Sequence, residues 1–409
     1  MSDASAPRVS PSPSVERRRN HPIIVAEWDS GERQAFVKAF FTGSQSKGAH
    51  LDNLKRELSA RYGGRPALLF NRARFGIDLA LRRFCERQPD RNEVIFPGYI
   101  CPSVPEAIER CGLKPIAADV RDDLNIDPAE ISRRLNARTL AVIAAHMYGC
   151  PAPIADIEAL CRDAGVFLID DAAQVAGVTV DGRLFGTFGD CGLLSFSQSK
   201  TIVAGDRNAG GVLLVNNPDF EAPFERSWAE LPDGRFRLRD TPWFFLDGAL
   251  NANRASFAYY ASAVRRRLTG IEPAPMPVVA CKMANLSAGI ALRQIASLSQ
   301  RVAGRTRVVA EFAARLVGDG RIGMPQFAAG RYLTRVLIRP PDSVDIAAYR
   351  ARLGQAGIAT RAAYPPIAAR IGRVPRATEY AARLVEIPSH SRMDPGIIVE
   401  ICAAAVRAL

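Results

Sequence analysis

Two ionisable residues, Asp171 and Lys200, each follow a short apolar run of the sequence and could together do acid–base and covalent chemistry. The run Val166–Ile169 has no polar residue and stops at Asp170 and Asp171. A stretch with several glycines then leads to a second, mostly apolar run, 192–196, and to Lys200. A lysine amine attacks a carbonyl group once its pKa falls, and a carboxylate stabilises a nearby cation. The pattern therefore indicates a site for a ligand that needs both an acid and an amine.

Repeated strand–turn–helix units must position these residues. Short apolar runs alternate with helical periodicity through the first half of the chain, and polar turns join them. This alternation predicts an α/β fold in which a mostly parallel sheet is covered by helices on both faces. Such sheets bind ligands at the carboxyl ends of their strands, where we expect Asp171 to lie. The predicted strands are 67–70, 94–96, 115–119, 140–145, 166–169, 192–196 and 212–215, and the predicted helices are 33–41, 51–62, 77–84, 104–111, 131–135 and 154–164.

The length of 409 residues suits one large domain and a smaller one. Residues 1–25 are rich in Ser and Pro with a basic end, which is typical of a disordered tail. We expect an N-terminal arm and a large ligand-binding domain over 26–275, and a small α+β domain over 276–409. The last third is predicted to contain a long helix, 286–317, then strands 332–338 and 384–387 and helices 346–354 and 397–409.

The composition of the chain indicates which kinds of partner the protein could bind. The formal net charge of +12 is spread along the chain, mostly as Arg, which favours attraction of anionic small molecules over a nucleic-acid groove. No apolar run reaches the roughly 18 residues of a membrane span, and the N-terminus has no apolar segment typical of a secretory signal. Eight scattered cysteines without a CxxC pair indicate reduced thiols in a cytoplasmic protein. The four histidines form no metal-ligand pattern, so no metal site is predicted.

The stretch around Asp171 and Lys200 resembles the DegT/StrS-type family of pyridoxal-phosphate (PLP) sugar aminotransferases. The resemblance rests on particular residue types that stand at separated positions of the chain and in the same order as in the family. It covers roughly residues 30 to 409. The residues that carry it are Asp171-Ala172-Ala173-Gln174, Gly186, Gly189-Asp190, Ser195-Phe196 and Lys200, together with Phe96-Pro97-Gly98-Tyr99, His146-Met147-Tyr148-Gly149 and Gly210-Gly211.

The resemblance implies the fold of aspartate aminotransferase (PLP fold type I), with a seven-stranded-type sheet in the large domain, and a homodimer with its sites at the subunit interface. It also implies roles for residues. Lys200 would hold PLP covalently and later carry a proton between two carbons, and Asp171 would pair with the ring nitrogen. Gln174 would contact the ring or its phenolic oxygen, and Ser195 would donate its hydroxyl to the phosphate. Asp170 is expected to be structural.

Three positions depart from the family. Its Ser-Gly-Thr turn, which binds phosphate, is replaced here by Arg72-Ala73-Arg74. Ala73 and Arg74 would then bind the phosphate, the latter by a charge-assisted contact, unless Arg74 is a surface residue on a rearranged turn. An Asn that reaches across the dimer aligns with Ala280. The aromatic residue that stacks on the cofactor ring aligns with Cys101, and Tyr99 is the alternative.

The resemblance implies a PLP-dependent aminotransferase that moves an amino group from glutamate or glutamine to a keto sugar, usually nucleotide-linked. A cyclitol or another natural-product ketone stays open as acceptor. The alternatives are another PLP reaction on the same scaffold, such as sugar dehydration or deoxygenation, and a non-catalytic descendant that binds PLP or a nucleotide sugar. Family members that deoxygenate sugars replace the lysine with His, whereas this chain has Lys200.

Overall fold

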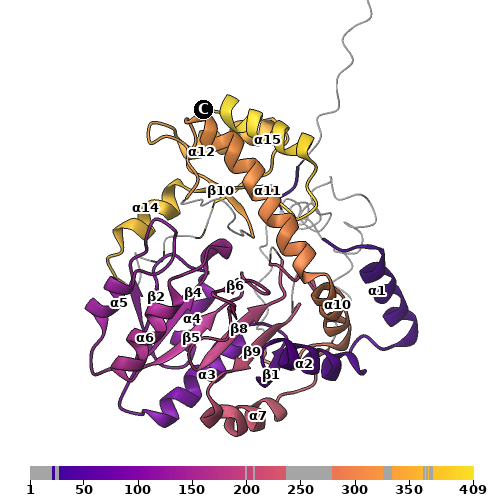
Figure 1. Ribbon diagram of the computed structural model, residues 1–409, viewed down its shortest axis with the longest axis vertical. Coiled ribbons are helices and arrows are strands. Elements are labelled where there is room, and N and C mark those ends of the chain that lie inside the picture. Colours follow the sequence, from indigo (N-terminus) through magenta and orange to yellow (C-terminus); the bar gives the residue numbers. More distant parts are fainter. Residues whose placement is uncertain are drawn as a thin grey trace, which may run out of the picture.

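The computed structural model arranges the chain in two lobes, a large one built around a sheet and a smaller one that contains the C-terminus (Figure 1). It describes residues 21–23, 27–198, 200–205, 208–235, 279–325, 334–362, 364, 367 and 372–409. Most of the predicted tail, 1–25, therefore lies outside the described residues. At its end, the backbone N–H of His21 donates to the carbonyl of Gly357 at 2.8 Å, which ties this point to the small lobe.

Within the described residues, seven strands form one sheet in the order β1-β9-β8-β5-β4-β2-β3. β9 runs antiparallel to both of its neighbours, and the other neighbouring pairs are parallel. The strands are β1 (Ala67–Phe70), β2 (Glu93–Pro97), β3 (Lys114–Ala118), β4 (Thr139–Ala145), β5 (Phe167–Asp171), β8 (Cys191–Ser195) and β9 (Gly211–Val215). Each lies within one or two residues of its predicted position. The predicted mostly parallel sheet is confirmed.

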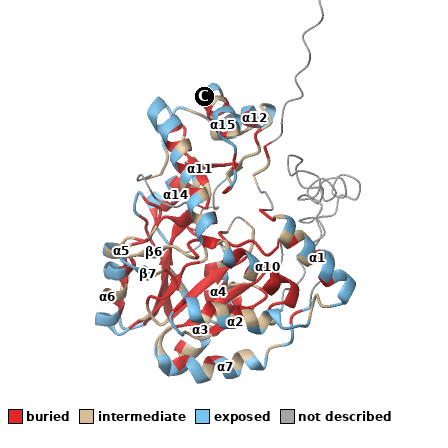
Figure 2. Cartoon of the chain, turned by 45° about the vertical axis from the view of Figure 1, so that its right-hand side comes forward, coloured by how far each residue is buried: buried red, intermediate tan, exposed pale blue. Residues whose placement is uncertain are grey.

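Helices cover both faces of this sheet, so that the strands are enclosed (Figure 2). Neighbouring residues of a strand point to opposite faces; thus Leu168 enters one apolar core and Ile169 the other. The helices of the Leu168 face are α1 (Ser30–Thr42), α2 (His50–Arg61), α5 (Pro128–Arg134), α6 (Ile154–Ala164) and α10 (Asn285–Ala296). Those of the Ile169 face are α3 (Arg74–Arg87), α4 (Ser103–Arg110) and α7 (Glu221–Ala229).

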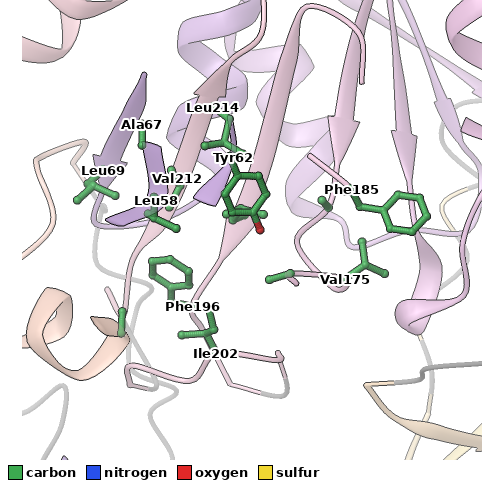
Figure 3. Close-up of a cluster of buried hydrophobic side chains, with 14 of the residues drawn as sticks. Leu58, Tyr62, Ala67, Leu69, Val175, Phe185, Phe196, Ile202, Val212 and Leu214 are labelled. Carbon is green, nitrogen blue, oxygen red and sulfur yellow. The ribbon is translucent and has the colours of Figure 1, made fainter. Parts of the chain in front are cut away.

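The core on the α2 face also anchors the loop that carries Lys200. Figure 3 shows Phe196 and Ile202, which flank this loop, beside Leu58 of α2 and Val212 of β9. Phe196 and Ile202 are buried almost completely. Burying an apolar side chain of this size contributes about 1.5–3 kcal/mol. The two ends of the loop are therefore fixed against the sheet.

The small lobe has a core of its own, in which three helices pack on one face of a second sheet. This sheet has the order β10-β12-β11. Its strands are β10 (Val336–Ile338), β11 (Arg361–Ala362) and β12 (Val385–Ile387), and the three helices are α11 (Leu298–Asp319), α12 (Ile346–Gln355) and α15 (Pro395–Arg407). An α+β arrangement was predicted for this part of the sequence.

The predicted single helix 286–317 is wrong in one respect, because the structure divides it into α10 and α11. The break lies at Ser297, whose φ of −106° and ψ of 16° are not helical. The Ser297 hydroxyl donates to the carbonyl of Gln294 at 3.3 Å, a local bond with which serine competes against helix continuation. α10 packs in the large core and most of α11 in the small one. No helix among the described residues, α11 included, is long and apolar enough to cross a membrane.

Some short elements have no counterpart in the predicted set. They are the two-stranded ribbon of β6 (Thr179–Val180) and β7 (Arg183–Leu184), the strand β11, and the helix α14 (Pro375–Arg383). Two-residue strands are too short to show a period-2 pattern. The predicted strand 332–338 is observed over Val336–Ile338, and its residues 332 and 333 lie outside the described part.

Two buried ion pairs connect the segment before α2 with α11. Glu27 pairs with Arg305, and Glu32 pairs with Arg301 at 3.0 Å; all four side chains are buried. Glu27 also accepts hydrogen bonds from the backbone N–H and the hydroxyl of Ser391. Burial alone would raise the pKa of Glu27, but the Arg305 guanidinium and the Ser391 hydroxyl hold it below its usual value. The folded state therefore favours the ionised carboxylate.

We predict that Glu27→Gln lowers the free energy of unfolding at pH 7 by about 3–5 kcal/mol, because it leaves the Arg305 charge buried without its partner. The pKa of Glu27 is lower in the folded state than in the unfolded state, where it is near the ordinary 4.5. The stability difference between the two proteins is thus complete above that pH and disappears as the pH falls through the folded pKa. Urea unfolding at several pH values measures it.

The matched control is Glu311→Gln, which removes a partly exposed pair of α11 with Arg307 at 2.7 Å. Such a pair contributes only about 0–1 kcal/mol. Equal losses for the two variants would contradict the role assigned to Glu27.

Candidate active site

The carboxyl ends of four strands meet at one edge of the large sheet. Asp171 of β5 lies opposite Ala145 of β4 and Leu193 of β8. Ser195 at the end of β8 lies opposite Gly211, which in turn lies opposite Phe70 at the end of β1. The turns that follow β1, β5 and β8 therefore come together, as predicted for Asp171. The structure brings the predicted residues 73, 171, 174, 195 and 200 to this edge from separate parts of the sequence.

The two neighbouring carboxylates have different surroundings. Asp170 accepts hydrogen bonds from the backbone N–H groups of Gly186 at 2.6 Å and Phe188 at 3.2 Å, and it contacts His146 Nε2 at 2.8 Å. The Nδ1 atom of His146 accepts from the N–H of Ala152 at 3.0 Å, so Nε2 carries the proton and donates to Asp170. Asp170 thus holds the turn around Gly186 and is structural.

The Asp171 carboxylate accepts fewer hydrogen bonds than that of Asp170. Its Oδ1 atom accepts from the N–H of Ala173 at 3.1 Å, and the residue is 8% exposed. Burial raises the pKa of this carboxyl above its usual value, and the nearby positive charge of Lys200 opposes that rise. A carboxylate at the end of a buried strand, with capacity for a further cation, suits a ligand that carries a positive charge.

Lys200 lies close to Asp171 on the loop after β8. Desolvation of its ammonium group and the charge of Arg335 together lower its pKa to about 8, against the opposing effect of the Asp171 carboxylate. An amine with this pKa is available in its neutral, nucleophilic form much nearer to neutral pH than an ordinary lysine. The residue as a whole is half-buried.

Backbone contacts hold the Lys200 loop on both sides. The N–H of Ala204 donates to the carbonyl of Phe196 at 2.8 Å. The side-chain amide of Gln294 in α10 donates to and accepts from the backbone of Val203. Trp28 donates its indole N–H to the same carbonyl of Val203 at 2.8 Å. Lys200 therefore extends from a fixed loop.

The small lobe contacts the site through Thr334, next to the start of β10. The Thr334 hydroxyl donates to Gln174 Oε1 at 3.3 Å, and its backbone N–H donates to the carbonyl of Tyr148 at 2.6 Å. Arg305 donates to the Thr334 carbonyl at 2.6 Å and to the Lys200 carbonyl at 3.5 Å. The Glu27–Arg305 pair thus connects both lobes at the site. The sequence did not single out Thr334 or Arg305, because neither stands in a recognisable motif.

The turn after β1 offers an anion site. The helix α3 begins at Arg74, three residues before its predicted start, and its N-cap residue Ala73 supplies no side-chain cap. The N–H groups of a first helical turn attract anions. A Cβ atom on Gly211 would lie 2.3 Å from the Cα of Ala73, so a glycine is required at this crossing. Ser195, which pairs with Gly211 in the sheet, has its hydroxyl 3.2 Å from that of Ser197.

Arg74 lies near this turn but is paired elsewhere. Its guanidinium is 3.7 Å from the Glu106 carboxylate of α4, and both side chains are substantially exposed. An exposed pair at this distance contributes little free energy, so an anion at the α3 N-terminus could replace Glu106 at small cost.

Tyr99 and Cys101, the two candidates for stacking on the ring, both follow β2. Cys101 lies half-buried before α4, with its sulfur 3.2 Å from the Ser103 hydroxyl, and its thiol acts on the pKa of Lys200. Tyr99 is buried instead, with its hydroxyl 3.1 Å from that of Tyr148. The rings of Tyr148 and Tyr364 stack with centroids 5.5 Å apart. Cys101 is therefore the more accessible of the two alternatives, and Tyr99 belongs to an aromatic group.

The segment with Ala280 lies against the turn after β1. The Asn71 side chain donates to the carbonyl of Val279 at 3.1 Å and accepts from the N–H of Cys281 at 3.2 Å. Ala280 between them is half-buried. Its methyl side chain cannot make the polar contact expected of an Asn there.

A family model described as the DegT/DnrJ/EryC1/StrS aminotransferase family matches residues 27–406. GDP-perosamine synthase of Vibrio cholerae is 30% identical over 200 residues, which is 48% of this chain and 53% of that protein. The chain thus spans about half the length of this relative. GDP-perosamine synthase of Caulobacter vibrioides is 25% identical over 317 residues, 76% of this chain and 74% of the relative.

Two solved structures share the fold at low identity. PseC of Helicobacter pylori, an aminotransferase of pseudaminic acid biosynthesis by its description, superposes with a TM-score of 0.77 at 15% identity over 95% of this chain and 99% of that one. The GDP-4-keto-6-deoxy-D-mannose-3-dehydratase of E. coli superposes with a TM-score of 0.75 at 15% identity, covering 95% of this chain and all of the other. These likenesses establish the fold, which a dehydratase and an aminotransferase share.

We predict that Asp171→Asn lowers the pKa of Lys200 below about 8, because it removes the negative charge that favours the ammonium form. The measurement is the pH dependence of Lys200 acetylation in ligand-free protein, followed by mass spectrometry of the peptide. Lys38 on the exposed surface of α1 serves as the internal reference. An unchanged or raised midpoint for Lys200 would show that Asp171 does not act on it.

Proposed function

Because the chain belongs to the DegT/DnrJ/EryC1/StrS aminotransferase family, we propose that it is a PLP-dependent aminotransferase that moves an amino group from glutamate or glutamine to a nucleotide-linked keto sugar. The observation that carries the proposal is the pair of Lys200, with its pKa lowered to about 8, and the buried carboxylate of Asp171 at one sheet edge. An activated amine beside a cation-stabilising carboxylate matches the two groups that this cofactor requires of a protein.

The donor set of the site fits PLP at each end of that molecule. Lys200 would hold its carbonyl carbon, and Asp171 would pair with its ring nitrogen. Gln174 would contact the ring or the phenolic oxygen, with its own amide oriented by Thr334. Ala73, Arg74 and Ser195 would bind the phosphate at the uncapped start of α3. Cys101 would lie against a face of the ring.

The bound cofactor would supply a ring that accepts electrons from the carbon next to the transferred nitrogen. Asp171 would keep a proton on the ring nitrogen, since its own charge is compensated only by a nearby cation. Lys200 would take a proton from one carbon and return it to the next as a general base and acid. The buried rings of Tyr99 and Tyr148 would limit the access of water from the small-lobe side.

The net charge of the chain and the names of its relatives support the proposed acceptor. The chain carries a formal net charge of +12, which attracts a nucleotide diphosphate. Several relatives are named for GDP-, UDP- and dTDP-linked amino sugars, among them a dTDP-3-amino-3,4,6-trideoxy-α-D-glucose transaminase that is 28% identical over 186 residues. We therefore include a nucleotide-linked keto sugar in the proposal.

We further propose that the protein acts as a homodimer in the cytoplasm. Val37, Phe40 and Phe41 of α1 are exposed, Phe41 by 81%, and would supply an apolar surface for a second copy. All eight cysteines are free thiols, which suits a reducing compartment.

A sugar dehydratase is the second candidate, because such an enzyme shares the fold. Lys200 weighs against it, since the family members that deoxygenate sugars have His at this position. A descendant that only binds the cofactor would not need the amine, the carboxylate and Gln174 together.

We predict that borohydride treatment of the PLP-loaded protein attaches the cofactor irreversibly to Lys200 and to no other lysine, as read by peptide mass spectrometry. Lys200→Arg should lose both this label and the colour of the bound cofactor, and transamination should fall by about 10²–10⁴-fold or more because the proton carrier is absent. Lys282→Arg, which changes a lysine beside Trp228, is the control. Labelling at another lysine would overturn the site.

We also predict that protein loaded with the amine form of the cofactor regains the aldehyde-form spectrum when mixed with a nucleotide-linked 3-keto or 4-keto deoxysugar. The product should gain an amino group, detected by mass spectrometry, and Lys200→Arg is the control. A product that has lost a hydroxyl group without gaining nitrogen would favour the dehydratase. No response to any of the GDP-, UDP- and dTDP-linked ketones would contradict the proposed acceptor.

A further inference from the structure

The helix α14 belongs to the small lobe in sequence but packs on the large one. Along the chain it lies between β11 and β12, two strands of the small sheet. Its residues Ala377 and Tyr380, and Val374 just before it, are buried in the core of the Ile169 face of the large sheet. Figure 1 shows the helix against the large lobe. The connection between two strands of the small sheet is therefore anchored on the other lobe.

A carboxylate of the large lobe caps this helix. The residue at its own N-cap position, Val374, supplies no side-chain cap. Instead, Asp119 accepts from the backbone N–H of Ala377 at 2.9 Å with Oδ1 and from that of Arg376 at 3.1 Å with Oδ2. A capping carboxylate normally comes from the residue just before the helix, whereas Asp119 directly follows β3 and is 257 positions from Arg376. Asp119 is buried, so it joins the two lobes away from solvent.

Two further contacts hold the same helix. The Tyr380 hydroxyl donates to Asp122 Oδ1 at 3.0 Å. Val374 lies so close to Gly98 that a Cβ atom on this glycine would be 2.8 Å from Val374 Cγ2. Gly98 directly follows β2, and its N–H donates to the carbonyl of Ala118 at the end of β3 at 2.7 Å. The glycine therefore allows the segment before α14 to approach the carboxyl edge of the large sheet.

The same connection contains residues that lie beside the candidate active site. Tyr364, between β11 and α14, stacks on Tyr148 of the large lobe with ring centroids 5.5 Å apart. Arg361 of β11 binds Glu386 of β12 in a fork, with contacts of 2.9 and 3.1 Å. Arg335, just before β10, contacts the same carboxylate at 3.1 Å. Anchoring α14 therefore also fixes an aromatic contact between the lobes and the position of two arginines.

The small lobe determines the surroundings of Lys200. Burial is the largest cause of the lowered pKa of this lysine, and the charges of Arg335 and Arg361 on the small lobe lower that pKa as well. The carboxylate of Asp171 and the thiol of Cys101, both on the large lobe, act in the opposite direction. A small lobe that moved away would remove two cations and admit water, and both changes favour the ammonium form.

We propose that Asp119 is a positioning residue, which caps α14 and thereby holds the small lobe in place beside Lys200. Its carboxylate binds the backbone N–H groups of Val120, Arg376 and Ala377, so its effect on the lysine passes through the small lobe. A cap that served stability alone would lower the free energy of unfolding and leave the folded site unchanged. The role concerns Lys200 in the ligand-free protein and does not require the proposed reaction.

The first test is the pH dependence of Lys200 acetylation in ligand-free protein, read by mass spectrometry of the peptide. In Asp119→Ala we expect the midpoint to rise from about 8 toward the 10.5 of an ordinary lysine, by about one pH unit or more, because the two arginines move away and water enters. Asp119→Asn keeps one acceptor oxygen and should restore part of the difference, since Asn is itself a good cap.

Asp127→Ala is the matched control. Asp127 also caps a helix, α5, by accepting from the N–H of Ala129 at 2.9 Å, but this helix packs within the large lobe. The control should lower stability without moving the Lys200 midpoint. Equal midpoints for the wild type and a folded Asp119→Ala protein would overturn the positioning role, as would equal changes in Asp119→Ala and Asp127→Ala.

Hydrogen exchange gives a second readout at a contact that Asp119 does not make itself. The N–H of Thr334 donates to the carbonyl of Tyr148 across the two lobes at 2.6 Å. Its exchange should become about 2- to 30-fold faster in Asp119→Ala, the effect of a lost helix cap on an opening equilibrium. Asp127→Ala should leave it unchanged.

Tyr380→Phe decides the question if Asp119→Ala does not fold. It removes only the hydroxyl that binds Asp122 and keeps the buried ring, and it should accelerate exchange at Thr334 in the same direction. Unchanged exchange in this variant would then refute the proposal. A protein that binds no PLP or transfers no amino group would refute the proposed function instead, and both measurements would still decide the role of Asp119 because they use ligand-free protein.

Discussion

The structure depends on placing two opposite charges, Asp171 and Lys200, together where water is scarce. Burial shifts the pKa of each toward the neutral form, and each charge opposes the shift of the other. Desolvated charges are tolerated only when their partners are held in place. The β-ladders fix Asp171 between β4 and β8, and Gln294 and Trp28 fix the loop that carries Lys200. The contacts that hold these segments therefore also keep the amine in the surroundings that lower its pKa.

The small lobe completes this site only if it stays docked, and a second set of buried charges provides for that. Arg305 of α11 pairs with Glu27 and donates to the carbonyls of Thr334 and Lys200. Thr334 in turn orients Gln174. Because one guanidinium contacts the arm, the small lobe and the Lys200 loop, a shift of any one of the three disturbs the others. Because Glu27 neutralises the charge of Arg305, the effect of this pair on the chemistry passes through position.

The main sheet and the position of the site could be predicted from the sequence. Local apolar patterns indicate the strands, and in a parallel sheet the carboxyl ends of neighbouring strands lie at the same edge. The runs before Asp171 and Lys200 are observed as β5 and β8, and they are neighbours in the sheet. What escaped prediction depends on contacts between distant segments. Arg335 and Arg361 stand in ordinary surroundings of the sequence, and only the pairing of β10 and β11 with β12 brings them to Glu386. The break at Ser297 likewise follows from the packing of α10 and α11 in different cores.

The charged groups of the site lie at two ends, one at the end of β1 and the other at the small lobe. At the end of β1 the partners of an anion are backbone N–H groups and Arg74, whose pairing with Glu106 is exposed and weak. An anion at this end can therefore displace Glu106 at small cost. At the small-lobe end, Arg335 is buried and meets a carboxylate already claimed by Arg361. Under the proposed function the pocket accepts an amino acid and a sugar in turn, and Lys200, close to Asp171, is the residue at which both react.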